Sequence, residues 1–88
     1  MNPAATVEFI LYSRESCRLC RDFTAQLDSL LSGHDYTCHV LDVDSDSDLV
    51  HRYGARLPVL VGNGIEICES RFDADAIMAF VRQYSGRP

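Results

Sequence analysis

Apolar residues recur at two different periods in the first half of the chain, and they predict a strand, a helix and a second strand. Thr6 to Tyr12 is almost continuously apolar, which favours a central strand covered on both faces. From Cys17 onward the apolar residues follow steps of three and four, which predicts an amphipathic helix that ends near Gly33. The residues of this stripe are Cys20, Phe23, Leu27, Leu30 and Leu31. Tyr36 to Val43 is the second predicted strand.

Shorter patterns follow in the second half of the chain. The acidic and serine residues at positions 44–48 favour the cap and first turn of a short helix that ends at Tyr53. Leu57 to Val61 and Ile65 to Cys68 are predicted strands. The turn Gly62-Asn63-Gly64 between them is typical of a β-hairpin, so we expect these two strands to be antiparallel neighbours.

A last amphipathic helix completes the order β-α-β-α-β-β-α. Asp73 is its expected N-cap, and apolar residues follow at i, i+3, i+4 and i+7. These residues are Ile77, Phe80, Val81 and Tyr84. The first βαβ unit must be parallel and right-handed, and the closing hairpin antiparallel. We therefore predict one α/β domain over residues 1–88, with a four-stranded mixed sheet and helices on both of its faces.

Composition and charge limit the class of protein. A chain of 88 residues, 47% of them hydrophobic, can bury a single core. A formal net charge of −5 argues against a general nucleic-acid-binding protein. No apolar run approaches the roughly 20 residues of a membrane span, and residues 1–5 lack the basic and apolar regions of a secretory signal. We therefore expect a cytoplasmic protein with no nucleic-acid or membrane partner.

The pair Cys17-x-x-Cys20 lies where the first strand passes into the first helix, and it is the candidate for chemistry. Two cysteines three residues apart share one side of a helical turn and can close a small disulfide ring. With Ser16 as N-cap, Cys17 would take the first helical position. Unpaired N–H groups and the positive helix end would there lower the pKa of the Cys17 thiol. Three arginines surround the pair: Arg14, Arg18 and Arg21.

Two other uses of the cysteine pair remain open. It could be half of a zinc site, although zinc normally takes four ligands, and Cys38 and His39 would point to opposite faces of their strand. The pair could also be two inert thiols. Cys38 and Cys68 are themselves expected to be packed and non-catalytic, because unpaired cysteine is commonly buried. A paired motif at a strand-to-helix turn in a reducing compartment favours redox chemistry.

The element order, the cysteine pair after the first strand and Leu57-Pro58 before the third strand together resemble the glutaredoxin-like branch of the thioredoxin superfamily. Tyr12-Ser13-Arg14 is similar to the Tyr-Ser/Thr-Lys/Arg that precedes the cysteines in that branch. The resemblance spans about Thr6 to Tyr84 and implies a thioredoxin-like fold of the glutaredoxin type. It also implies a cis Leu57–Pro58 bond that faces the cysteine pair.

Several positions depart from the family pattern. The chain has no Trp, and Arg18-Leu19 stands where typical glutaredoxins have Pro-Tyr. Arg56-Leu57 replaces the Thr-Val before the proline, and Cys68 to Asp73 has no clear match to the Gly-Gly-x-Asp stretch that holds glutathione. The chain is most similar to the small glutaredoxin-like proteins of unassigned substrate. We expect glutathione to be a poor reductant for it.

These observations predict a thiol–disulfide oxidoreductase that reduces a disulfide-containing protein. Cys17 would attack as the thiolate, and Cys20 would resolve the mixed disulfide. Arg14 and Arg18 would stabilise the thiolate; the other expected substrate-binding residues are Leu57, Pro58 and Arg71, the last as a carboxylate anchor. We expect a monomer that requires no metal or other cofactor. A non-catalytic binding module with this fold, or a dimer that carries a metal or cluster on the cysteine pair, stays open as an alternative.

Overall fold

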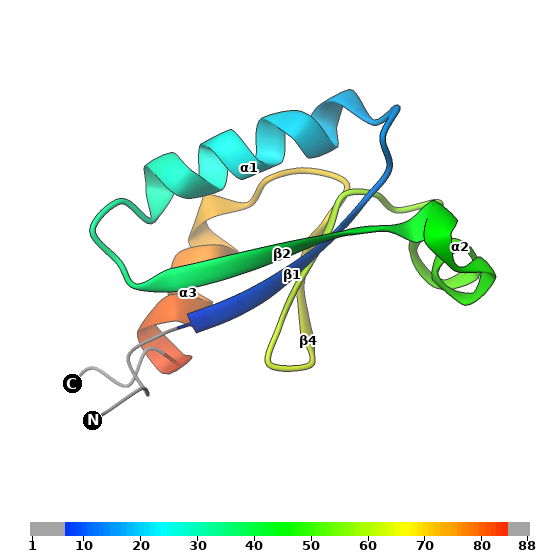
Figure 1. The fold of residues 1–88 in the computed structure, drawn as a ribbon. Coiled ribbons are helices and arrows are strands. Elements are labelled where there is room, and N and C mark those ends of the chain that lie inside the picture. The colour runs from blue at the N-terminus through cyan, green and yellow to red at the C-terminus, as the bar shows by residue number, and fades with distance from the viewer. Residues whose placement is uncertain (1–6, 85–88) are drawn as a thin grey trace.

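The elements follow the predicted order in a computed structural model that describes residues 7–84 (Figure 1). The strands are β1 (Val7–Ser13), β2 (Tyr36–Asp42), β3 (Val59–Gly62) and β4 (Ile65–Glu69). The helices are α1 (Arg18–Leu30), α2 (Ser47–Tyr53) and α3 (Ala74–Tyr84), and a short 3-10 turn, η2 (Val43–Ser45), precedes α2. No helix within residues 7–84 has the length and apolar character needed to cross a membrane.

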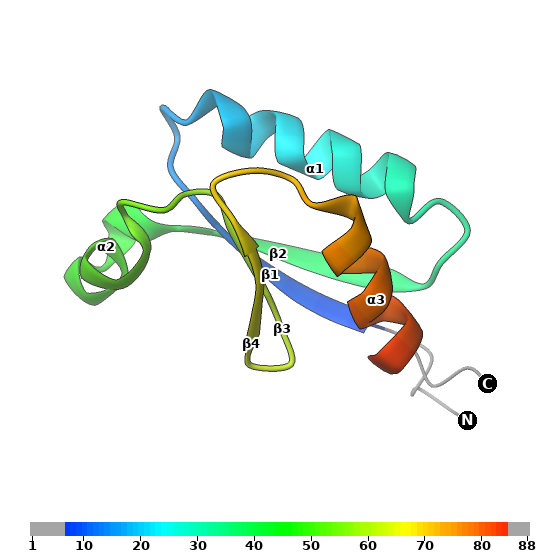
Figure 2. The same cartoon turned by 180° about the vertical axis from the view of Figure 1, so that it is seen from behind.

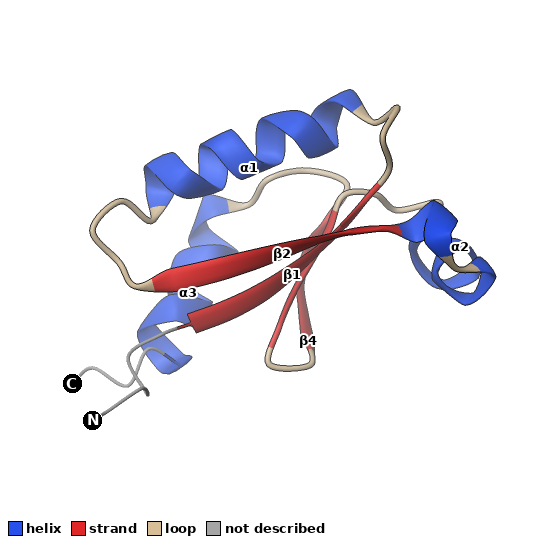
Figure 3. Cartoon of the chain, viewed as in Figure 1, coloured by secondary structure: helices blue, strands red, loops and turns tan. Residues whose placement is uncertain are grey.

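The strands form one mixed four-stranded sheet in the order β2-β1-β3-β4 (Figure 3). β1 is parallel to β2, with Val7 opposite Tyr36 and Ser13 opposite Asp42. β3 runs antiparallel to both β1 and β4. The predicted α/β fold, with its parallel βαβ unit and antiparallel hairpin, is confirmed.

The main core lies between one face of the sheet and the helices α1 and α3, which lie next to each other in Figure 2. Alternate residues of β1 point into this core because successive strand side chains face opposite sides. The buried members are Val7, Phe9, Leu11, Phe23, Leu27, Leu31, Leu60, Ile77, Phe80 and Val81. The helical stripes predicted from the periodicity therefore pack on the sheet.

The other face of the sheet carries a smaller core beneath α2, which lies apart from α1 and α3 in both views (Figures 1 and 2). Val59 and Val61 of β3 are buried there with Val43 and Tyr53. The ring of Tyr53 stacks on that of Tyr12, with centroids 3.9 Å apart. Helices therefore contact both faces of the sheet, as predicted.

The β3–β4 turn has the backbone that the Gly62-Asn63-Gly64 sequence predicts. Asn63 and Gly64 both adopt positive φ, at 55° and 77°, as the favoured two-residue hairpin turn requires. Gly62 is needed for a different reason. A Cβ atom at this position would come within 2.6 Å of Cζ of Phe80, so the close approach of α3 to β3 depends on the missing side chain.

Five predicted strand ends differ from the structure by one or two residues, and the predicted start of the first strand at Thr6 lies outside the described residues. β1 ends at Ser13 rather than Tyr12, β3 ends at Gly62 rather than Val61, and β4 ends at Glu69 rather than Cys68. β3 begins at Val59 rather than Leu57, because Pro58 has no N–H to donate to the ladder. β2 ends at Asp42 rather than Val43. Oδ1 of Asp42 accepts the N–H of Asp44 at 2.9 Å and so caps the 3-10 turn that follows.

Candidate functional site

The turn from β1 into α1 places Cys17 at the start of the helix. The Cys17 N–H donates to the carbonyl of Arg14 at 2.9 Å and closes the turn. Cys17 has an extended backbone, with φ −88° and ψ 109°, and Sγ of Cys17 accepts the N–H of Cys20 at 3.2 Å. Cys17 is therefore itself the N-cap, and α1 begins at Arg18. The prediction that Ser16 caps the helix is wrong, because the helix begins one residue later than predicted and the N–H of its third residue, Cys20, donates to the Cys17 sulfur.

The two sulfur atoms of the pair differ in exposure. Cys17 and Cys20 lie at disulfide distance, and their Cα atoms are 5.3 Å apart. Cys17 is half-buried at the surface turn, whereas Cys20 is only 4% exposed and lies on the apolar side of α1. A partner molecule can therefore reach Cys17 first, and Cys20 is held directly behind it.

The arginines around the pair have different environments. The guanidinium of Arg14 binds both carboxylate oxygens of Asp44, with Nε 3.0 Å from Oδ2 and Nη2 3.1 Å from Oδ1. Arg21 donates to the carbonyl of Glu15 at 3.2 Å, and Arg18 is exposed. Asp44 therefore compensates the charge of Arg14. The sequence did not indicate this ion pair. The roles of Arg14 and Arg18 at the Cys17 thiolate stay predictions.

The segment before β3 lies at the same end of the sheet as the cysteine turn. Tyr12 pairs with Val59, so the residues that follow β1 and those that precede β3 meet at this edge. The Leu57–Pro58 peptide bond is cis, as predicted, and the Pro58 side chain is fully buried. The expected contact of Pro58 with the Cys17 sulfur, and the contribution of Leu57 to a substrate groove, stay predictions.

Ser70 joins the β4–α3 connection to this segment. Its N–H donates to the carbonyl oxygens of Pro58 at 2.9 Å and of Arg56 at 3.0 Å, and its φ is 68°. Two residues after Ser70, the Phe72 ring packs edge-on against the ring of Phe23 in α1, with ring centroids 5.1 Å apart. Exposed Arg71 is held between these two anchors.

Arg56, which lies between α2 and β3, links α2 to β4. Its guanidinium donates to Glu66 at 2.8 Å and to Glu69 at 2.6 Å, and to the backbone carbonyl of Arg52 at 2.9 Å. Sequence reasoning missed the structural parts played by Arg56 and Ser70. Serine is not a residue type that signals positive φ, and the partners of Arg56 lie at least ten positions away in the chain, apart from Arg52.

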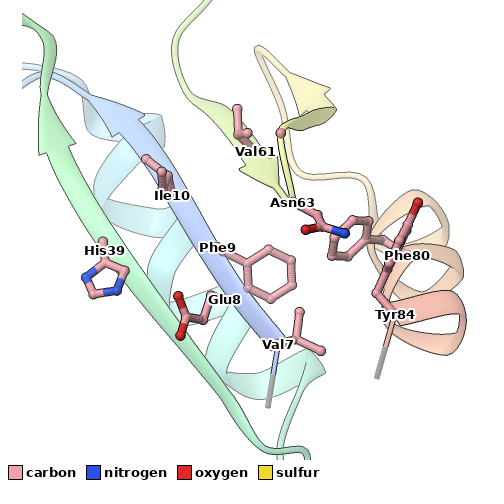
Figure 4. Close-up of a pocket in the computed structure, with 10 residues that line it drawn as sticks. Val7, Glu8, Phe9, Ile10, His39, Val61, Asn63, Phe80 and Tyr84 are labelled. Carbon is pink, nitrogen blue, oxygen red and sulfur yellow. The ribbon is translucent and has the colours of Figure 1, made fainter. Parts of the chain in front are cut away.

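Two pockets differ in their relation to the cysteines. A pocket of about 430 Å³ opens beside the pair. Its lining residues are Ser13, Arg14, Glu15, Cys20, Arg21, Thr24 and Val40. A second pocket of about 420 Å³ lies between the start of β1, the turn at Asn63 and the end of α3 (Figure 4). No cysteine is among the described residues that line it, so the cysteine site lies at the other end of β1.

The remaining cysteines lack the features of the pair. Cys38 and Cys68 are both half-buried, and burial raises the pKa of each thiol. Within residues 7–84, no group of three or more histidine, cysteine and acidic side chains is placed to hold a metal ion. The reactive thiol chemistry that this structure supports is therefore centred on Cys17 and Cys20.

Comparison with known proteins gives a family and a fold. The family model described as Glutaredoxin-like domain (DUF836) matches residues 8–82. Protein Ne2328 from Nitrosomonas europaea, known from a solution structure, is 29% identical with a TM-score of 0.80, over 91% of this chain and 96% of that one. Protein XcR50 from X. campestris is 29% identical with a TM-score of 0.67, over 85% and 96%.

A thioredoxin has the same fold at greater distance. A mutant thioredoxin from Halobacterium salinarum is 24% identical with a TM-score of 0.60, over 93% of this chain and 77% of that one. No curated protein matches the sequence of this chain significantly.

Proposed function

The chain belongs to the glutaredoxin-like domain family, and from this we propose that it is a thiol–disulfide oxidoreductase that reduces disulfide bonds in proteins through Cys17 and Cys20. One observation carries the proposal. A half-buried sulfur caps a helix and accepts the N–H of Cys20 at 3.2 Å, and the second sulfur lies buried at disulfide distance. Stabilisation at a helix start is what a nucleophilic thiolate requires.

The first step is attack by the Cys17 thiolate on one sulfur of the substrate disulfide. A bond forms between Cys17 and that sulfur, and the second substrate sulfur leaves as a thiolate and takes up a proton. The Cys20 N–H, which donates to Sγ of Cys17, and the positive end of the α1 dipole favour the charged form of the nucleophile. We assign Arg14 and Arg18 to the same role through their positive charge.

The second step is attack by Cys20 on the Cys17 sulfur of the mixed disulfide. This releases the second substrate thiol and leaves a Cys17–Cys20 disulfide, so two electrons and two protons have passed from the protein dithiol to the substrate. A dithiol reductant must then reduce the pair. Burial of Cys20 beside Cys17 favours this step over loss of the mixed disulfide to an outside thiol.

We propose a groove for the substrate on the side of Pro58. Leu57 would pair its backbone with an extended substrate segment, Pro58 would pack beside the reacting sulfurs, and Arg71 would bind a substrate carboxylate. Glutathione would be a poor reductant, since Glu69, Ser70 and Arg71 place bulk and a negative charge where the family's glutathione site has glycines. The protein would act as a cytoplasmic monomer without a cofactor.

Reduction of insulin by dithiothreitol tests the proposal, with turnover followed as the reduced chains precipitate. The wild-type protein should accelerate the reaction, and Cys17→Ser should abolish the acceleration. Cys20→Ser should accumulate a mixed disulfide that mass spectrometry locates on Cys17. Replacement of dithiothreitol by glutathione with glutathione reductase should give slower turnover. A wild-type protein without activity on insulin and on small disulfides would overturn the proposal in favour of a binding module.

A further inference from the structure

We propose that the protein substrate of this site carries acidic residues beside its disulfide, and that exposed arginines around Cys17 select it by charge. The inference rests on the redox function proposed above and names the substrate class. Three residues form what we call the arginine cluster: Arg18, Arg21 and Arg71. Leu19, which is 55% exposed between the two cysteines, adds an apolar contact at its centre.

The segment that contains the cysteine pair has a positive net charge in an acidic chain. Residues 14–22 contain three arginines and two acidic residues, a net charge of +1, in a chain whose formal net charge is −5. The rest of the chain therefore carries −6. A positive net charge at the reactive region of an acidic protein favours the approach of acidic partners to that region.

Ion pairs within the molecule do not cancel the arginine cluster. The carboxylate of Asp44 compensates Arg14, and Glu66 and Glu69 compensate Arg56. Within residues 7–84, the three arginines of the cluster form no such pair, and Arg21 donates only to a backbone carbonyl. Their charges therefore remain available to a partner.

The start of α1 also lacks the acidic residues found at the other helix starts. Aspartates cap η2, α2 and α3. α1 is instead capped by the Cys17 sulfur, and its first turn contains no acidic residue. The positive end of the α1 dipole therefore adds to the charge of Arg18 and Arg21 rather than being offset.

Arg71 belongs to the cluster because the β4–α3 connection is fixed beside the site. On one side, Ser70 donates its N–H to the carbonyl of Pro58 at 2.9 Å. On the other side, the Phe72 ring contacts Phe23, which lies one helical turn beyond Cys20. These anchors hold Arg71 between the Pro58 segment and α1, the two segments that we propose border the substrate of Cys17.

Matched peptides test the charge selection on the Cys20→Ser variant, which stops at the mixed disulfide. Each peptide has one cysteine activated as a disulfide with 2-thiopyridine, flanked by aspartates, by lysines or by serines. Released 2-thiopyridone reports the rate of attack by Cys17. One exposed charge pair is worth roughly 1.5- to 5-fold, so we expect the aspartate peptide to react about tenfold faster than the lysine peptide at low salt. High salt should reduce this ratio towards one.

Charge reversal identifies the residues responsible. Arg18→Glu and Arg71→Glu should each lower the aspartate-to-lysine ratio several-fold. Arg82→Glu makes the same change of charge in the last turn of α3, at the opposite end of the molecule from the start of α1 (Figure 1), and should leave the ratio unchanged. Each ratio compares two peptides on one variant, so an altered thiolate fraction or a partly unfolded sample cancels.

The outcomes separate this inference from the function on which it rests. Equal rates with the three peptides, or a preference that survives Arg18→Glu and Arg71→Glu, would overturn the charge selection while leaving the reactive Cys17 in place. An equal loss of preference in Arg82→Glu would also overturn it, because net charge alone would then explain the ratio. Failure to react even with the serine peptide would overturn both proposals.

Discussion

Replacement of Ser70 by glycine should leave the protein more stable than replacement by alanine. Ser70 has φ of 68°, a region in which a residue with a Cβ atom is strained by roughly 1–3 kcal/mol. Glycine removes that strain but gains about 0.5–1 kcal/mol of conformational entropy in the unfolded chain. Alanine retains the strain. Both variants lose the hydrogen bond from the Ser70 hydroxyl to the carbonyl of Arg56, which is long at 3.4 Å and worth about 0.5 kcal/mol or less.

The difference between the two variants isolates the backbone effect, because the hydroxyl is absent from both. We expect Ser70→Gly to be about 1 kcal/mol more stable than Ser70→Ala, with the wild-type protein between them or close to the glycine variant. For a domain of this size, 1 kcal/mol corresponds to about 4–8 °C in Tm. Urea unfolding followed by circular dichroism measures the free-energy difference, with m expected to stay constant, and thermal unfolding measures the shift in Tm.

Gly64 provides an internal control for this prediction. Its φ is 77°, and a Cβ atom built on it meets no other atom within 4 Å. Gly64→Ala therefore introduces backbone strain without a packing clash, and it should destabilise the protein by about 1 kcal/mol. If Ser70→Gly were less stable than Ser70→Ala while Gly64→Ala behaved as expected, the positive φ at Ser70 could not be the source of strain.

Three further predictions concern the core, the pH dependence and the thiols. Gly62→Ala should cost about 1–3 kcal/mol in urea unfolding, because its Cβ would lie 2.6 Å from the Phe80 ring, and Phe80→Leu should remove most of that cost. Burial and then the hydrogen bond to Asp28 raise the pKa of Tyr36 to about 12. Stability from this group is complete below pH 10 and is lost as pH rises towards 12, so Tyr36→Phe should lose less stability over this range than the wild-type protein. In the reduced protein at neutral pH, iodoacetamide should modify Cys17 before the half-buried thiols Cys38 and Cys68, and Cys20 last, as peptide mass spectrometry would show. A cost for Gly62→Ala that persists in the Phe80→Leu background, a Tyr36→Phe curve that falls as steeply as that of the wild type, or Cys38 reacting first would contradict the respective argument.

The fold and the placement of the cysteine pair could be predicted because local patterns determine them. Cys20 shares the helical period of Phe23 and Leu27, so its burial follows from the same stripe that packs α1 on the sheet. The hairpin follows from Asn63 and Gly64, whose positive φ the turn requires. Element ends were harder to predict. η2 depends on the N–H of Asp44 that donates to Asp42, and α1 begins one residue later than predicted because the Cys17 sulfur, rather than the Ser16 hydroxyl, caps it.

The surroundings of the sulfurs could not be predicted, because contacts between distant parts of the sequence build them. Arg14 reaches Asp44 across 30 positions, and this pair joins the cysteine turn to the segment that leads into α2. Ser70 reaches Arg56 across 14 positions and joins the β4–α3 connection to the segment of Pro58. No periodicity relates such residues, and each lies in a turn where many partners are compatible with the sequence. Local sequence alone therefore places Cys17 and Cys20, the groups that we propose to be reactive. The charge and shape that a substrate would meet around Cys17 exist only when all four segments are folded together.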